Sequence, residues 1–193
     1  MSLDLPWRGV DRAGHPLELR EAGRRDGARF LEHLALIVNE TPFMLQGGAD
    51  PLPDIADQKD ILDEYASRDN CVCIIAGRPG PPAGRQAVIG SATLVGGRWR
   101  RTAHTAELSM GVNRAHWGQG IGGLLLDAAL TWARQSPILT RVGLSVFASN
   151  TAAVELYRSR GFVEEGRLVR FAKWEGRYDD LIGMSLLFGG SDG

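Results

Sequence analysis

The sequence predicts a mixed α/β (α+β) fold in a single domain, with a mostly antiparallel central sheet of six to seven strands flanked by about four helices. The length of 193 residues is the usual size of one domain with one hydrophobic core. Hydrophobic residues make up 44% of the chain and charged residues 23%, which is the ordinary balance of a globular protein. Strand and helix patterns alternate without an internal repeat or a long linker, which favours one domain over residues 1–193.

The first part of the chain contains patterns for one strand and two helices. Residues 16–21 alternate between apolar and polar, as expected for a half-buried strand. Residues 26–38 and 54–66 carry apolar side chains at helical spacing and predict two helices. Between these helices, residues 41–53 contain a glycine pair and are predicted to form a loop.

Three strands and a long helix are predicted in the middle of the chain. Residues 71–76 and 86–95 are rich in apolar and β-branched residues, which favour strands. Residues 77–84 between them are rich in glycine and proline and predict a hairpin loop. Residues 105–112 predict a further strand, and residues 124–134 have the clearest apolar helix face in the chain.

The last part of the chain predicts a strand, a short helix and a closing hairpin. Residues 142–148 favour a strand, and residues 150–160 favour a helix that starts at a good capping residue, Asn150. Residues 168–174 and 179–188 can pair across the turn between them as two antiparallel strands.

Charge and composition exclude several classes of protein. With 22 basic and 23 acidic residues the net charge is −1, so the positive excess of a nucleic-acid binder is missing. No stretch approaches the ~20 apolar residues of a membrane span, and the N-terminus lacks a secretory signal pattern, so we expect a cytoplasmic protein without membrane or nucleic-acid partners. Cys71 and Cys73 are too close for a disulfide and too few for a zinc site, so we expect buried, reduced thiols and no metal. Residues 1–15 and 189–193 are expected to be flexible ends.

Glycine is the unusual feature of the composition. The chain has 25 glycines, and they are densest at Trp117-Gly118-Gln119-Gly120-Ile121-Gly122-Gly123, between a predicted strand and the helix with the clearest apolar face. Such a turn presents unpaired backbone N–H groups at a helix N-terminus, where they and the helix dipole attract a phosphate. It lacks the Gly-Lys-Ser/Thr of a triphosphate-binding loop and the G-x-G-x-x-G spacing of a dinucleotide-binding turn. The alternative is that the glycines only ease the packing of the helix against the sheet.

Two signatures resemble those of the GCN5-related N-acetyltransferase (GNAT) family. Gly120-Ile121-Gly122, followed by three leucines, is similar to the pyrophosphate-binding turn of the family. About thirty residues later, Asn150-x-x-Ala153-x-x-Leu156-Tyr157-x-x-x-Gly161-Phe162 is similar to its second signature. The resemblance covers roughly residues 75–187. It implies a GNAT-like fold, acetyl-CoA as the cofactor, and direct transfer of acetyl to a primary amine without an acyl-enzyme.

Shorter matches resemble a bacterial branch of the family that includes L-amino-acid N-acetyltransferases. They are Thr41-Pro42-Phe43, Glu107-Leu108, Val146-Phe147 and Gly176-Arg177-Tyr178-x-Asp180. The match implies a small-molecule amine, with a free amino acid as the first choice. A peptide or protein acetyltransferase acting on an N-terminus or a lysine is the alternative enzyme, and a non-catalytic CoA-binding module is the alternative of another class. The oligomeric state stays open, with a homodimer as the assembly considered.

The resemblance also implies roles for individual residues. N–H groups near Gly111 and Val112 would polarise the thioester carbonyl, and Tyr157 would protonate the leaving thiolate. Trp117 stands where the family often has Gln or Arg, so only its N–H would serve there. The residues implied in cofactor binding are Met110, Gly111, Val112, Trp117, Gly118, Gln119, Gly120, Ile121, Gly122, Gly123, Asn150 and Tyr157.

A base must deprotonate the acceptor ammonium before it can attack. Glu107, on the predicted strand that leads into the turn, is the predicted catalytic base. His104 and His116 flank that strand and titrate in the neutral range, so they are alternatives, as is water. Ser145 stands where ribosomal-protein N-terminal acetyltransferases commonly carry a glutamate, so the chain departs from that branch.

Overall fold

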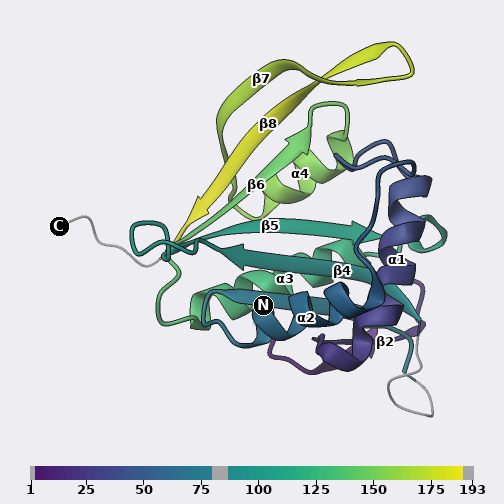
Figure 1. Ribbon diagram of the computed structural model, residues 1–193, viewed down its shortest axis with the longest axis vertical. Helices are drawn as coiled ribbons and strands as arrows, with labels where there is room; N and C mark the ends of the chain where they lie inside the picture. Colours follow the sequence, from purple (N-terminus) through teal and green to yellow (C-terminus); the bar gives the residue numbers. More distant parts are fainter. Residues whose placement is uncertain (1–2, 80–86, 189–193) are drawn as a thin grey trace.

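The structure, a computed structural model, describes residues 3–79 and 87–188. Within these residues, eight strands form one sheet in the order β1-β2-β3-β4-β5-β6-β8-β7 (Figure 1). The strands are β1 (Trp7–Val10), β2 (Pro16–Glu21), β3 (Cys71–Gly77), β4 (Val88–Gly96), β5 (Thr105–Val112), β6 (Arg141–Phe147), β7 (Val163–Trp174) and β8 (Arg177–Leu187). The α-helices are α1 (Gly27–Glu40), α2 (Ile55–Ala66), α3 (Ile121–Gln135) and α4 (Thr151–Ser159), and the 3-10 helices are η1 (Arg24–Asp26) and η2 (Arg114–His116).

The pairing of β5 with β6 distinguishes this sheet from a regular one. All other neighbouring strands are antiparallel, whereas β5 and β6 run parallel and pair over only three residue pairs, from Thr105 with Arg141 to Glu107 with Gly143. Beyond these pairs, β5 continues along β4 and β6 continues along β8. Figure 1 shows β6 and β8 diverging from β5 and β4. The sheet is therefore open between the C-terminal parts of β5 and β6.

The helices cover both faces of the sheet. On one face, Phe30 of α1 and Leu62 of α2 pack with Ile75 of β3. On the other face, Leu125 of α3 belongs to a larger core cluster that includes Ile74 of β3 and residues of α4. Successive residues of a strand point to opposite faces, so β3 is buried on both sides and appears in the sequence as a continuous apolar run.

Each predicted helix and strand is present in the structure. The largest boundary difference is at β7, which begins at Val163 rather than at 168, because its side chains are exposed at nearly every position and show no alternation. The capping prediction for α4 is confirmed, since the Asn150 side chain accepts a hydrogen bond from the Ala153 N–H at 3.3 Å. Cys71 and Cys73 are buried and unpaired, as predicted.

The N-terminal end contains a strand that the sequence did not predict. The residues expected to be flexible include β1, which pairs with β2 from Trp7–Leu19 to Val10–Pro16. Leu3 is only 4% exposed, and its N–H donates to Thr131 Oγ1 of α3 at 3.2 Å. A strand of four residues is too short to show a clear alternation, so the sequence predicted six to seven strands where the structure has eight. Residues 80–86 of the predicted hairpin loop region and the tail 189–193 lie outside the described residues.

A buried histidine joins α1 to the sheet beside the open end of β5. His33 is 1% exposed, and its Nδ1 lies 2.5 Å from Asn113 Oδ1 and its Nε2 2.9 Å from Ser91 Oγ. Asn113 follows β5 and also donates through Nδ2 to the Val88 carbonyl at 3.3 Å. Burial lowers the pKa of His33 to about 4, against a smaller opposing effect of the Asn113 hydrogen bond. The ring is therefore neutral in the folded protein at neutral pH.

We predict that His33 makes the fold less stable as the pH falls below 6.5. The unfolded chain protonates this ring near pH 6.5 and the folded protein only near pH 4, so acid favours unfolding between these values. The contribution of His33 to the free energy of unfolding should fall by about 2 kcal/mol between pH 7 and pH 5. Urea unfolding of the protein and of His33→Gln, which cannot take up this proton, measures it. Equal pH slopes for the two proteins would contradict the prediction.

Candidate active site

Where β5 and β6 separate, a cavity of about 370 Å³ lies beside the first turns of α3 and α4. We call it the smaller cavity. Its walls come from the end of β5 and the turn after it, from α4, and from the end of α1 with the loop that follows. The lining residues are Ile37, Thr41, Phe43, Met44, Met110, Gly111, Val112, His116, Trp117, Gly118, Gly120, Ile121, Gly122, Asn150, Ala152, Ala153, Leu156 and Tyr157.

The glycine-rich turn has the backbone conformation that glycine favours. Gly118 and Gly120 have φ angles of 76° and 79°, in the left-handed region, and Gly120 is the residue that precedes α3. The first N–H groups of a helix have no carbonyl of a preceding turn to bind. For the N–H groups of Ile121, Gly122 and Gly123, no protein acceptor is found among the described residues.

The space next to these donors fits an anionic group. A Cβ at Gly118 would meet no atom within 4 Å, and a Cβ at Gly122 would reach toward the cavity wall, 3.5 Å from Met110 Cε. Free donors, the positive end of the α3 dipole and the absence of side chains are the features that a phosphate or diphosphate requires. The turn can therefore hold the diphosphate of a nucleotide cofactor such as CoA.

The open edge of β5 adds further backbone groups to the cavity. The Asn113 N–H donates to the Ile89 carbonyl of β4 at 2.9 Å, in register with the β4–β5 ladder. Because such bonds alternate along an antiparallel ladder, the Gly111 peptide groups also face β4, and those of Met110 and Val112 face the open side. Of the N–H groups in the region of Gly111 and Val112, those of Met110 and Val112 are therefore the ones that can donate to a ligand in the cavity.

The Trp117 side chain is hydrogen-bonded to the end of β5. Its indole Nε1 donates to the Val112 carbonyl at 2.6 Å, and its ring lies 5.9 Å from the guanidinium carbon of Arg114. Its backbone N–H donates to the Arg114 carbonyl at 3.1 Å within η2. This N–H, which was expected to serve the cofactor, is therefore already used within η2, whereas the side chain lines the cavity.

The opposite wall of the smaller cavity comes from α4. The Tyr157 side chain lies in the core, with its ring centroid 5.7 Å from that of Phe162, and the residue is 8% exposed. Its hydroxyl makes no hydrogen bond with any residue in the described part of the chain. Burial raises the pKa of Tyr157 to about 12. Tyr157 is thus a protonated donor whose hydroxyl is available to a ligand.

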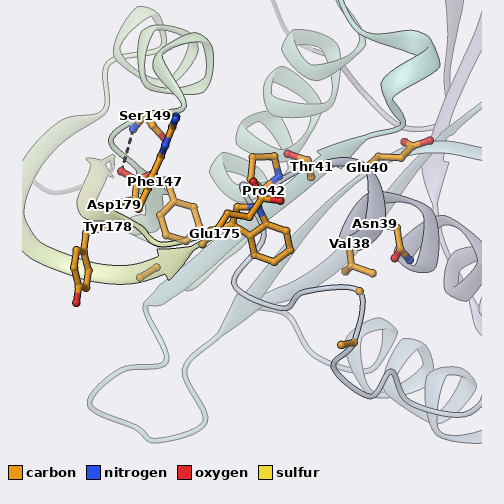
Figure 2. Close-up of a pocket in the computed structure, with 15 residues that line it drawn as sticks. Val38, Asn39, Glu40, Thr41, Pro42, Phe147, Ser149, Glu175, Tyr178 and Asp179 are labelled. Carbon is orange, nitrogen blue, oxygen red and sulfur yellow. Dashed lines mark hydrogen bonds between the residues drawn. The ribbon is translucent and has the colours of Figure 1, made fainter.

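A larger cavity has a volume of about 910 Å³, and Figure 2 shows the residues that line it. It is formed by the end of α1 and the following loop on one side and by β6, β7 and β8 on the other. Thr41 lines both cavities, and the successive residues Ser149 and Asn150 line one each, so the two cavities adjoin there. The residues lining the larger cavity are Val38, Asn39, Glu40, Thr41, Pro42, Gly48, Ala49, Phe147, Ser149, Ala172, Trp174, Glu175, Arg177, Tyr178 and Asp179.

Two carboxylates of the larger cavity also hold its backbone in place. Glu40 Oε2 accepts the Arg114 N–H at 2.8 Å, which ties the end of α1 to η2. Asp179 accepts hydrogen bonds from Ser149, through its N–H at 3.3 Å and through its hydroxyl, as Figure 2 shows. These contacts connect the two walls of the larger cavity to the segments that form the smaller one.

Glu107 lies outside both cavities. It belongs to the part of β5 that pairs with β6, and its partner there is Gly143. The Glu107 side chain lies over this glycine, since a Cβ added to Gly143 would be 2.7 Å from Glu107 Oε1. Burial raises the pKa of Glu107, Arg141 lowers it, and Glu165 raises it further. Gly111 is the fourth residue after Glu107 along β5, about 13 Å away. Its role as the catalytic base therefore stays a prediction, which its position outside the two cavities does not support.

The remaining predicted residues divide into two groups. Met110, Gly111, Val112, Gly118, Gly120, Ile121, Gly122, Asn150 and Tyr157 all line the smaller cavity, as does Trp117. Gln119 and Gly123 do not line it: Gln119 Oε1 accepts from Arg78 at 3.0 Å, and a Cβ at Gly123 would face Arg160. Of the two histidines considered as bases, only His116 lines the cavity, with its Nδ1 buried and without a partner in the described residues.

The sequence did not predict the wall formed by α1 and its loop. Ile37, Thr41, Phe43 and Met44 come from a region far from the glycine turn along the chain. Their only signal was the short branch match at residues 41–43. Separately, no cluster of metal-ligating side chains is found in the described residues, and none of their helices is long and apolar enough to cross a membrane.

Comparisons with known proteins are consistent with this geometry. Residues 39–162 match the model of the acetyltransferase (GNAT) family. An acetyltransferase of the GNAT family from Streptococcus pneumoniae is 32% identical, with a TM-score of 0.83 over 89% of this chain and 99% of that one. A putative acetyltransferase from Salmonella typhimurium, solved with its cofactor acetyl-CoA, is 21% identical and has the same fold, with a TM-score of 0.78 over 92% of this chain and 96% of that one.

Among curated proteins, the spermidine N(1)-acetyltransferase of Vibrio cholerae serotype O1 is 36% identical over 83 residues, which are 43% of this chain and 48% of that protein. The match thus spans about half the length of this relative. The family model, by contrast, covers well over half of this chain and includes the glycine turn, the open edge of β5 and α4. The resemblance noted in the sequence is confirmed, and the chain belongs to the acetyltransferase (GNAT) family.

Proposed function

We propose that this family member transfers the acetyl group of acetyl-CoA to the primary amine of a small molecule, with a free amino acid as the first candidate. The observation that carries the proposal is that the two cavities adjoin at Thr41 and at the Ser149–Asn150 step. A donor in the smaller cavity and an amine in the larger one would meet at this junction. Direct transfer requires this proximity, since no side chain then has to carry the acetyl group between them.

The smaller cavity would bind the donor mainly through backbone groups. When bound, acetyl-CoA supplies a thioester carbon that an amine can attack. The first N–H groups of α3 would hold the diphosphate, and the N–H groups of Met110 and Val112 would donate to the thioester oxygen as negative charge develops there. Asn150 would contact the pantetheine arm through its Nδ2, because its Oδ1 is engaged in capping α4.

Tyr157 would stabilise the leaving sulfur by hydrogen bonding. Its pKa of about 12 exceeds the ~8.5 of an ordinary thiol, so full proton transfer from Tyr157 to the thiolate is unfavourable. Donation of a hydrogen bond requires no such transfer. As the N–C bond forms and the C–S bond breaks, a proton lost by the amine nitrogen completes the thiol.

Replacing Tyr157 by Phe should lower kcat about 100-fold and change the Kd for acetyl-CoA less than twofold, because the hydroxyl would act mainly on the developing thiolate. The melting temperature should stay the same, since the hydroxyl has no partner among the described residues. Thiol release at saturating amine and calorimetric titration measure the two constants. Tyr65→Phe, in α2 and away from both cavities, is the matched control. An unchanged kcat in Tyr157→Phe would remove the residue from the mechanism.

The charges of the larger cavity suit a substrate that carries both signs. Arg177 can bind a carboxylate, and Glu40 and Asp179 lie on segments that reach the junction, where they attract an ammonium. A free amino acid has both groups. With Glu107 remote, the ammonium would lose its proton to these carboxylates or to water.

A polyamine is a second candidate. The curated relative from Vibrio cholerae is named for spermidine, and Glu40, Glu175 and Asp179 give the larger cavity more negative than positive lining residues. A polyamine would use these carboxylates and would have no use for Arg177. The arginine therefore discriminates between the two substrate classes.

We expect thiol release with acetyl-CoA and free amino acids, and Arg177→Gln should raise the KM for them about tenfold with a smaller effect on kcat. The KM for the corresponding amines without a carboxylate should stay unchanged. Arg158→Gln, on α4 and outside both cavities, is the control. Release with polyamines alone would favour the second candidate, and release with peptides alone would favour an N-terminal or lysine acetyltransferase. Binding of acetyl-CoA without release on any amine would indicate a non-catalytic module.

We also propose that the protein forms a homodimer through the edge of the sheet at β7. Apolar side chains are exposed along this edge strand, including Val163 at 67%, Val169 at 72% and Phe171 at 48%. An unpaired strand edge with exposed apolar side chains favours pairing with another chain.

A homodimer should have twice the 20.9 kDa mass of the chain by size-exclusion chromatography with light scattering. Val169→Arg should shift it toward the monomer, because a charge would be buried in the interface. Val10→Arg, at an exposed position on the opposite edge strand, should leave the mass unchanged. A monomer of the unaltered protein at micromolar concentration would contradict this proposal.

A further inference from the structure

The N-terminal hairpin of β1 and β2 reaches the glycine turn. The Arg12 N–H, in the connection between the two strands, donates to the Gln119 carbonyl at 2.9 Å. Arg78 Nη2 donates to Gln119 Oε1 at 3.0 Å and lies 2.7 Å from Asp11 Oδ2. Two contacts therefore fix the hairpin connection against the turn that precedes α3.

Asp11 determines the path of the chain at Arg12. Its side chain is fully buried, and its Oδ1 accepts the N–H groups of Ala13 at 2.8 Å and His15 at 3.0 Å. Burial would raise the pKa of Asp11, but the hydrogen bonds from His15, Arg78 and Ala13 outweigh it and lower the pKa to about 2. The carboxylate stays charged at neutral pH, so the connection keeps this conformation.

The Arg12 side chain lies across Gly120. A Cβ at Gly120 would be 2.8 Å from Arg12 Cγ and 2.9 Å from Arg12 Nε. The missing side chain at position 120 thus leaves the room that the arginine occupies. Arg12 Nε therefore lies against Gly120, the residue that immediately precedes the free N–H groups at the start of α3.

Arg12 has no carboxylate partner within the described residues, unlike Arg78 and Arg160 near the turn. Arg78 pairs with Asp11, and Arg160 pairs with Asp127 at 2.6 Å. No ion pair or side-chain hydrogen bond involves Arg12 within the described residues. An unpaired guanidinium beside a cluster of unpaired N–H groups forms a positive site of the kind that binds phosphate.

We propose that Arg12 binds the diphosphate of acetyl-CoA, so that the N-terminal hairpin contributes a side chain to a site otherwise built from backbone groups. This inference rests on the proposed function, in particular on the seat of the diphosphate at the glycine turn. The planar guanidinium donates to two phosphate oxygens from one side, while the α3 N–H groups donate from the other. The hairpin therefore closes the site on its solvent side.

The test is the affinity of the intact protein for CoA and for 3′-dephospho-CoA, measured by calorimetric titration. Arg12→Gln, which keeps the length of the side chain but removes its charge, should raise the Kd about tenfold for both ligands. It should also make the Kd less dependent on salt, because one charge contact is lost. Arg100→Ala removes an exposed charge from the turn between β4 and β5, at the other end of β5, and should leave both values unchanged.

Two results would overturn the inference. One is an unchanged Kd for both ligands in Arg12→Gln. The other is a weaker Kd for CoA alone, which would place Arg12 at the 3′-phosphate instead of the diphosphate.

A glycine variant separates this inference from the proposed function. Gly122→Val adds bulk to the wall of the smaller cavity, where a Cβ has ordinary contacts, and should weaken binding of both ligands. Gly166→Val, in open space on β7, is the matched control. If Gly122→Val weakens binding and Arg12→Gln does not, only the role of Arg12 fails. If neither variant changes the Kd, the diphosphate does not bind at the turn and the proposed site fails as well.

Discussion

The short pairing between β5 and β6 is the constraint on which the site depends. Three residue pairs join the two strands, and each then follows a different neighbour. If the pairing continued, the peptide groups of Met110 and Val112 would bond to β6 and the smaller cavity would be closed. Contacts on both strands keep the ends of β5 and β6 apart. The end of β5 is fixed by Trp117 and by the His33–Asn113 hydrogen bond, and β6 is paired along its length with β8.

The two cavities use different kinds of groups, and this difference follows from what each would bind. The smaller cavity presents peptide N–H groups, which are fixed in place by α3 and β5 and so cost little entropy to order around a donor. Backbone donors also explain why a tryptophan is compatible with position 117, where the family often has Gln or Arg. The larger cavity presents charged side chains such as Glu40, Arg177 and Asp179, whose identity selects among amines.

The N-terminal hairpin holds the glycine turn in place. Glycine has more backbone freedom than other residues, so the sequence alone does not fix the conformation of this turn between a strand and a helix. In the structure it is held from outside by Arg12 and Arg78, which contact Gln119 and Gly120. Gln119 anchors this hairpin through its carbonyl and its side chain. A turn that is fixed before the ligand arrives would lose less conformational freedom on binding.

The sequence by itself determined the order of the α-helices and of the strands from β2 onward, the glycine turn, the cap at Asn150 and the family. Each of these depends on neighbours within a few residues, through side-chain periodicity, backbone preference or a local hydrogen bond. Tertiary structure decided that Glu107 lies outside both cavities, that Thr41 lines both of them, and that residues 7–10 form a strand. These outcomes depend on where two strands separate and on which segments distant in sequence meet. Contacts of that kind are set by the packing of the whole sheet, and a local sequence pattern does not contain them.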